Sequence, residues 1–109
     1  MRMCRAMEPF NLVWIEEPLD AYDYLGHAEL ARVIDTPIAT GEMLASVAEH
    51  VKLIEHQSCD IIQPDAPRVG GITEFLKLTT LAAQAGLTLA PHFAMQIHCH
   101  LASTYPTEP

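Results

Sequence analysis

The chain repeats one pattern four times: a short apolar run, an ionisable residue at its end, and a stretch with helical spacing of apolar residues. The runs cover residues 12–16, 38–42, 60–65 and 87–92 and end in Glu16, Glu42, Asp65 and His92, spaced 26, 23 and 27 residues apart. Strands that alternate with helices predict a parallel sheet with helical crossovers. The pattern therefore predicts an α/β fold, either an open doubly wound sheet or a β/α barrel.

The intervening segments have the apolar spacing and end signals of helices. Helices are predicted over residues 22–34, 46–56, 72–85 and 94–104, and the last turns of another over residues 1–9. Gly86 stands directly after the third of these, where a helix C-cap favours glycine. No low-complexity linker interrupts the pattern, so residues 1–109 are predicted to form one domain.

The ionisable residue at the end of every strand favours the barrel. In a β/α barrel, catalytic groups from several strands converge at the carboxyl ends of those strands, and a full barrel needs about 250 residues. The prediction is therefore a partial TIM-type barrel of about four β/α units. If side chains alternate along each strand, Glu42 shares the inner face with Thr40 and Ile38, and Glu17 points away from Glu16 into the loop or helix layer.

Composition excludes several classes of protein. The net charge is −8 and the six Lys and Arg residues are scattered, which predicts no nucleic-acid or membrane partner. No apolar stretch approaches the roughly 18 residues of a membrane span, and the N-terminus lacks signal-peptide order, so a cytoplasmic protein is expected. Three widely separated cysteines indicate neither a disulfide framework nor a zinc knuckle.

The four strand-end residues suit two kinds of chemistry. Glu16 and Glu42 are carboxylates of the kind that hold a hard divalent cation such as Mg²⁺. Asp65 and His92 suit proton transfer, because a carboxylate that binds one imidazole nitrogen fixes the tautomer and leaves the other nitrogen free. Asp65 could instead cap the following helix.

The other histidines are interpreted differently. His98 and His100 lie two residues apart, on different sides of a helix, which argues against a metal cluster with Cys99. The remaining histidines lie on predicted helices or at their ends and are expected at the surface; they are His27, His50 and His56.

Four motifs together resemble one family. They are "WIEEP" (residues 14–18), "TGE" (40–42), "QPDAPRVGGIT" (63–73) and "APHF" (90–93). In this order they resemble the C-terminal barrel domain of the enolase superfamily, mandelate racemase subgroup. Within the subgroup, the chain is most similar to acid-sugar dehydratases that act on galactarate or L-talarate.

The resemblance implies a reaction and a set of site residues. It places Glu16 and Glu42 on the second and third magnesium ligands of the family, and Asp65 and His92 on its Asp/His dyad. In such enzymes Mg²⁺ binds the carboxylate of the substrate, a base removes the neighbouring proton, and loss of a hydroxyl from the enediolate gives a 2-keto-3-deoxy acid sugar. A racemase or epimerase shares the first step and is the alternative within the superfamily.

The resemblance also implies groups that the chain does not contain. The first metal ligand, an aspartate, and the opposing lysine base would precede Met1, as would the capping domain, and a further glutamate would follow Pro109. The expectation is a fragment, inactive alone, of a parent that is a homo-oligomer; a non-catalytic gene remnant is the other alternative. Unpaired strand edges predict that the isolated chain aggregates, stays molten or dimerises.

Overall fold

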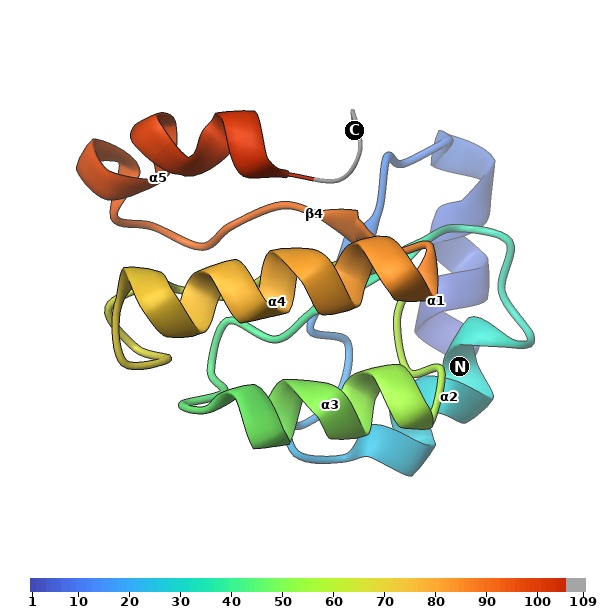
Figure 1. Cartoon of the computed structure of the whole chain (residues 1–109). Coiled ribbons are helices and arrows are strands. Elements are labelled where there is room, and N and C mark those ends of the chain that lie inside the picture. The colour runs from blue at the N-terminus through green and yellow to red at the C-terminus, as the bar shows by residue number, and fades with distance from the viewer. Residues whose placement is uncertain (106–109) are drawn as a thin grey trace.

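The computed structural model describes residues 1–105 as a four-stranded parallel sheet with helical connections (Figure 1). The strand order is β1-β2-β3-β4, so each strand pairs with its neighbour in the sequence. The strands are β1 (Ile15–Glu16), β2 (Ile38–Thr40), β3 (Ile61–Ile62) and β4 (Thr88–Leu89). The predicted α/β fold with a parallel sheet is confirmed, although every strand is shorter than predicted.

The helices alternate with the strands as the repeat predicts. The α-helices are α1 (Arg2–Met7), α2 (Tyr24–Ala31), α3 (Val47–Glu55), α4 (Ile72–Ala85) and α5 (Met95–Leu101). Two 3₁₀ turns, η1 (Glu8–Phe10) and η2 (Ala102–Thr104), extend the first and the last of them. The helix α4 has the predicted bounds, and Gly86 ends it in the left-handed conformation at φ 69°.

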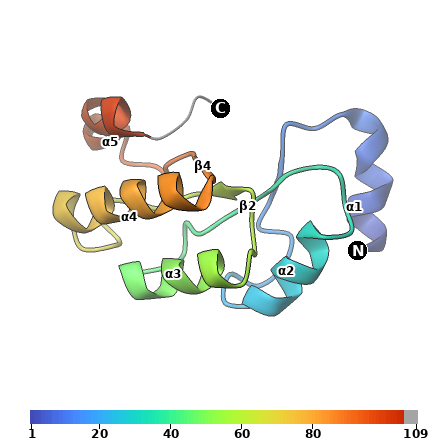
Figure 2. The ribbon, with the colours of Figure 1, turned by 45° about the vertical axis from the view of Figure 1, so that its right-hand side comes forward.

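One face of the sheet packs against helices, and we call it the helix-covered face. Ile15, Ile38, Ile62 and Leu89 of this face form a buried cluster with side chains of α2, α3 and α4. Figures 1 and 2 show α3 and α4 side by side along the sheet. Burial of these apolar side chains supplies the main driving force for folding.

The strand register assigns the other side chains to the opposite, open face. Glu16 pairs with Ala39, Ala39 with Ile61, and Ile61 with Thr88, so these four side chains lie in one row. Neighbouring strands of a parallel sheet keep paired residues on the same side. Trp14, Ile61 and Thr88 help to line a cleft of about 220 Å³ on this face.

The predicted alternation is wrong for β2. Ile38 and Thr40 are fully buried, and the register places them on the helix-covered face, not on the open face with Glu16. Gly41 follows at φ 122°, a conformation that side chains rarely adopt. The chain therefore leaves the regular pleat at Gly41, and Glu42 does not follow the alternation of the strand.

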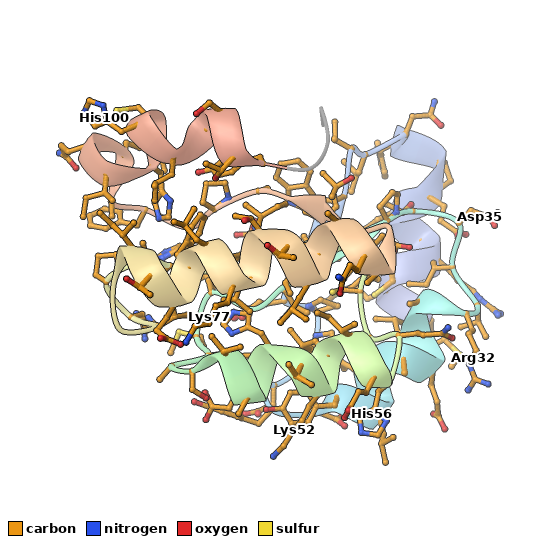
Figure 3. The ribbon with its side chains drawn as sticks, viewed as in Figure 1. Arg32, Asp35, Lys52, His56, Lys77 and His100 are labelled. Carbon is orange, nitrogen blue, oxygen red and sulfur yellow. The ribbon has the colours of Figure 1, made fainter. Side chains whose placement is uncertain are left out.

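Two histidines that were predicted at the surface are buried. His27 and His50 have no exposed surface, and each directs its Nδ1 atom to a backbone carbonyl, that of Asp23 at 3.0 Å or of Ser46 at 2.8 Å. This bond allows the neutral ring to be buried. His56, at the end of α3, is exposed as predicted and projects from the helix (Figure 3).

Among residues 1–105, no helix combines the length and the apolar character that crossing a membrane requires.

Candidate active site

The structure brings Asp65 and His92 into direct contact. Each lies just beyond a strand, after Pro64 and Pro91 respectively, and the backbone N–H of His92 donates to the Pro64 carbonyl at 3.2 Å. This backbone bond holds the two loops together beyond the short strands. The Nδ1 atom of His92 lies 3.0 Å from Oδ2 of Asp65. The predicted pair is therefore formed, with Nε2 left for another partner.

Asp65 also organises the turn that follows β3. Its Oδ1 atom accepts a hydrogen bond from the backbone N–H of Arg68 at 2.9 Å, and its carbonyl accepts one from Val69 at 2.9 Å. The carboxylate is buried, with a relative exposure of 6%. The alternative that Asp65 caps the following helix is wrong, because the N-cap of α4 is Gly71 and no side chain caps it; one oxygen of Asp65 organises the turn after β3 while the other contacts the imidazole of His92.

Glu42 faces the remaining nitrogen of His92. The Oε1 atom of Glu42 lies 3.7 Å from Nε2 of His92, and both side chains are partly exposed. This separation is longer than a hydrogen bond, so the two groups are neighbours across a gap. The imidazole of His92 thus stands between two carboxylates that come from different strand ends.

Glu16 lies on the open face and is held by two donors. Its Oε2 atom accepts hydrogen bonds from Nε1 of Trp14 at 3.1 Å and from Nε2 of Gln63 at 2.7 Å. Both bonds use the same oxygen, and the side chain is exposed. Neither donor contacts the Oε1 atom of Glu16. This arrangement is compatible with a carboxylate that binds a ligand through one oxygen.

Glu17 contributes more to the site than the sequence indicated. As predicted, it points to the helix-covered side, where its Oε1 atom lies 3.5 Å from Oγ1 of Thr40. Burial and the nearby charge of Glu42 raise the pKa of Glu17 above its ordinary value. Its backbone has φ 37°, which is uncommon for a residue with a side chain. Glu17 therefore adds a second acidic group beside Glu42.

Gln63 is a further residue that the site analysis of the sequence did not single out. It donates to Glu16, while its own Oε1 atom is buried without a hydrogen-bond partner among residues 1–105. Leaving a buried polar atom unpaired costs free energy. The "QPD" motif is the sequence signal for Gln63. Gln63 lies two residues before Asp65, and residues two apart on a strand share a face.

The carboxylates at these strand ends are compatible with a divalent cation. Mg²⁺ prefers oxygen ligands, and one or two protein carboxylates can hold it together with water and substrate oxygens. Glu16 and Glu42 provide such oxygens at the ends of adjacent strands. Among residues 1–105, however, no group of three or more His, Cys, Asp or Glu side chains forms a complete metal cluster. The donor set fits part of a magnesium site.

His98, Cys99 and His100 are not brought together as ligands. His98 is buried, with an exposure of 2%, whereas Cys99 and His100 are exposed. Figure 3 shows His100 on the outer side of α5. This agrees with the prediction that the three residues do not form a metal cluster.

Comparison with known proteins identifies the family. The family model described as "Enolase C-terminal domain-like" matches residues 1–109. The chain is 64% identical, over all 109 residues, to L-talarate/galactarate dehydratase of Salmonella typhimurium strain LT2, and it covers 27% of that protein. The chain belongs to the enolase C-terminal domain-like family.

Solved structures give the same result. A crystal structure of L-talarate dehydratase from Polaromonas sp. JS666, complexed with Mg and L-glucarate, is 70% identical with a TM-score of 0.96, and the match covers 99% of this chain and 30% of that one. An enolase from Bradyrhizobium, complexed with magnesium and mandelic acid, matches 99% of this chain and 30% of its own at 29% identity and a TM-score of 0.95. The chain spans about a quarter of the length of its curated dehydratase relative.

Proposed function

We propose that this chain forms the metal-binding and proton-transfer part of a magnesium-dependent acid-sugar dehydratase. The observation that carries the proposal is the arrangement of His92, paired with Asp65 at 3.0 Å and facing Glu42 at 3.7 Å, at the strand ends. The 64% identity to a talarate/galactarate dehydratase supports the same reaction class, with galactarate or L-talarate as substrates. On the same grounds we propose that the four strands form part of a (β/α) barrel.

We assign the metal to Glu16 and Glu42. When bound, magnesium would polarise the carboxylate of the substrate and thereby acidify the hydrogen on the neighbouring carbon. The bonds from Trp14 and Gln63 fix the orientation of Glu16, so that one of its oxygens is held ready. Glu17 adds negative charge beside Glu42, which favours a cation at this position.

We assign proton transfer at one face of the substrate to His92. The contact with Asp65 occupies Nδ1 and leaves Nε2 as the nitrogen that exchanges a proton. The carboxylate of Asp65 stabilises the imidazolium that forms when His92 takes up the proton. Returning a proton to the leaving hydroxyl would complete a dehydration, whereas returning it to carbon would give a racemase or epimerase.

Turnover by this route needs more groups than the described residues hold. The curated relatives are about four times as long as this chain, and residues 1–105 contain no complete metal cluster. We therefore propose that the complete active site includes a further metal ligand and a second proton-transfer group. A test of the reaction is best made in a chimera, where residues 1–109 replace the matching segment of the Salmonella typhimurium enzyme.

The product of the chimera distinguishes the three candidate functions. With galactarate and Mg²⁺, the proposal predicts a 2-keto-3-deoxy acid, detectable by ¹H NMR. Inversion of a stereocentre without loss of water would instead support the racemase or epimerase. A folded chimera without either activity, beside an active Salmonella typhimurium control, would support a non-catalytic remnant and contradict the proposal.

A further inference from the structure

The His98 side chain is buried at the back of the Asp65 loop. It lies on α5, and its Nε2 atom accepts a hydrogen bond from the backbone N–H of Ala66 at 3.3 Å. Ala66 directly follows Asp65 in the sequence and is fully buried. The ring of Phe75 packs against that of His98, with a centroid separation of 4.8 Å and a tilt of 58°. The imidazole is therefore fixed in position beside the Asp65–Ala66 peptide.

The hydrogen bonds of His98 define one tautomer. Because Nε2 accepts from Ala66, the ring hydrogen of the neutral imidazole is on Nδ1. The Tyr105 hydroxyl lies 3.3 Å from Nδ1 and 3.3 Å from the His98 carbonyl, so it can accept from the ring and donate to the carbonyl. Burial lowers the pKa of His98, which favours the neutral ring that this arrangement requires.

The same helix position carries a histidine in two other helices. His27 in α2, His50 in α3 and His98 in α5 each lie four residues after the N-cap residue and are buried. His50 packs against Gly41, where its Nε2 atom is 3.4 Å from the point that a Cβ would occupy. Two of these rings therefore pack against the backbone of a strand-end loop that carries a predicted site residue, Glu42 or Asp65.

We propose that His98 is a positioning residue for the Asp65–His92 pair. By holding the N–H of Ala66, it fixes the peptide that follows Asp65, and Asp65 in turn fixes the imidazole of His92. His98 does not touch the atoms that would react, because its ring lies behind the loop, against Phe75 and Tyr105. The inference deepens the proposed function, since it adds a residue that orients the proposed proton-transfer group.

The test uses NMR on the chimera, because the isolated chain is predicted to aggregate, stay molten or dimerise, and it does not depend on turnover. In His98→Leu, we expect the Ala66 amide to exchange with solvent about fivefold faster, because it loses its hydrogen-bond acceptor. We also expect the chemical shifts of the His92 ring resonances at a fixed pH to change, because Asp65 is less well held and its contact with the ring is altered. His98→Gln keeps an acceptor in the side chain and should restore much of the Ala66 protection.

His100→Leu is the matched control, because His100 lies two residues away on the exposed side of α5. It should leave both the Ala66 exchange rate and the chemical shifts of the His92 ring at their wild-type values. A folded His98→Leu chain with wild-type values for both would overturn the inference.

If His98→Leu does not fold, Tyr105→Phe decides the question. It removes only the hydroxyl that fixes the tautomer of His98, so Ala66 exchange should rise; unchanged exchange would overturn the inference. In the chimera, His98→Leu should lower kcat with little change in KM, and His98→Gln should recover much of the lost kcat. A chimera that lacks turnover even without substitutions would contradict the proposed dehydratase, while the NMR result would still decide the role of His98.

Discussion

The two faces of the sheet differ in what their side chains contact. On the helix-covered face, Ile38 and Ile62 are fully buried in a continuous apolar cluster with α2, α3 and α4. On the open face, Glu16 is exposed and its bonds come from the polar groups of Trp14 and Gln63. The first face stabilises the fold, whereas the second, with the loops at the strand ends, carries the charged groups of the proposed site.

Residues that stabilise the fold and residues of the proposed site therefore lie within a few positions of one another in the sequence. Substitutions on the helix-covered face should affect folding first, because they remove apolar contacts or leave cavities. Substitutions at the strand ends should affect ligand binding and turnover first, because charged groups meet there: Glu42 and Asp65 flank His92, and the charge of Glu42 helps to raise the pKa of Glu17. Active sites often retain such unfavourable charge at a cost in stability.

The largest effect on stability is expected for Ile62→Ala. Ile62 is fully buried against the helices, so truncation should lower the free energy of unfolding by about 2–5 kcal/mol, measured by urea denaturation. Ile61, the adjacent residue on the open face, is the matched control; it is also largely buried, at 7% exposure, but lies outside the apolar cluster, so Ile61→Ala should cost less than Ile62→Ala. Equal losses for the two variants would show that the faces do not differ as described.

A smaller effect should come from the buried histidine of α3. Burial lowers the pKa of His50, an effect partly offset by its hydrogen bond to the Ser46 carbonyl. The unfolded chain therefore binds a proton at His50 more readily than the folded chain does. The resulting stability is fully present above the ordinary pKa of 6.5 and decreases as the pH falls through the lowered folded value.

Urea denaturation between pH 5 and pH 8 measures this dependence. As the pH falls from 8 to 5, the wild-type chain should lose more free energy of unfolding than His50→Gln, which cannot take up the proton. His56→Gln, at the exposed end of the same helix, is the control and should retain the wild-type slope. If His50→Gln and the wild type had the same slope, the burial of His50 would not govern the pH dependence.

The smallest effect is expected for Glu17→Gln, and it should be stabilising. Burial and the charge of Glu42 raise the pKa of Glu17, so the ionised carboxylate destabilises the fold at neutral pH. Removing the charge should raise the free energy of unfolding by about a few tenths of a kcal/mol, because solvent screens a partly exposed group. The gain should vanish as the pH falls below the ordinary value of 4.5, where Glu17 is protonated in both states.

The same substitution should also change the affinity for Mg²⁺, which titration calorimetry of the chimera measures. Glu17→Gln should bind the cation more weakly, because one negative charge near Glu42 is lost. A destabilised Glu17→Gln chain at neutral pH would contradict the assignment of Glu17 as a strained acidic neighbour of Glu42.

Local signals in the sequence were sufficient to predict the helices and the parallel sheet. The bounds of α4 and the glycine that ends it follow from apolar periodicity and from the conformational freedom of Gly86. The Asp65–His92 pair was also predictable, because both residues directly follow strands that lie side by side. Apolar runs could not define the strand lengths, because regular pairing covers only two or three residues of each run, while single backbone hydrogen bonds such as that from His92 to Pro64 continue beyond it.

Tertiary packing determined the features that the sequence did not predict. Gly41 interrupts the alternation after β2, so counting by two from Glu42 placed Ile38 and Thr40 on the wrong face. His27 and His50 resembled polar surface residues, but each buries its ring by donating to the carbonyl four residues earlier. The burial of these rings depends on how each helix packs against the rest of the fold, which a local pattern does not describe.

The most direct test of the central proposal compares metal affinity and turnover in two variants of the chimera. Glu42→Gln removes a proposed ligand, so it should weaken Mg²⁺ binding, measured by titration calorimetry, and lower turnover. His92→Asn should lower turnover by about 10²-fold or more, as loss of a general acid/base group does, while Mg²⁺ affinity stays near that of the parent chimera. Parent-level turnover in His92→Asn, or unchanged Mg²⁺ affinity in Glu42→Gln, would contradict the account.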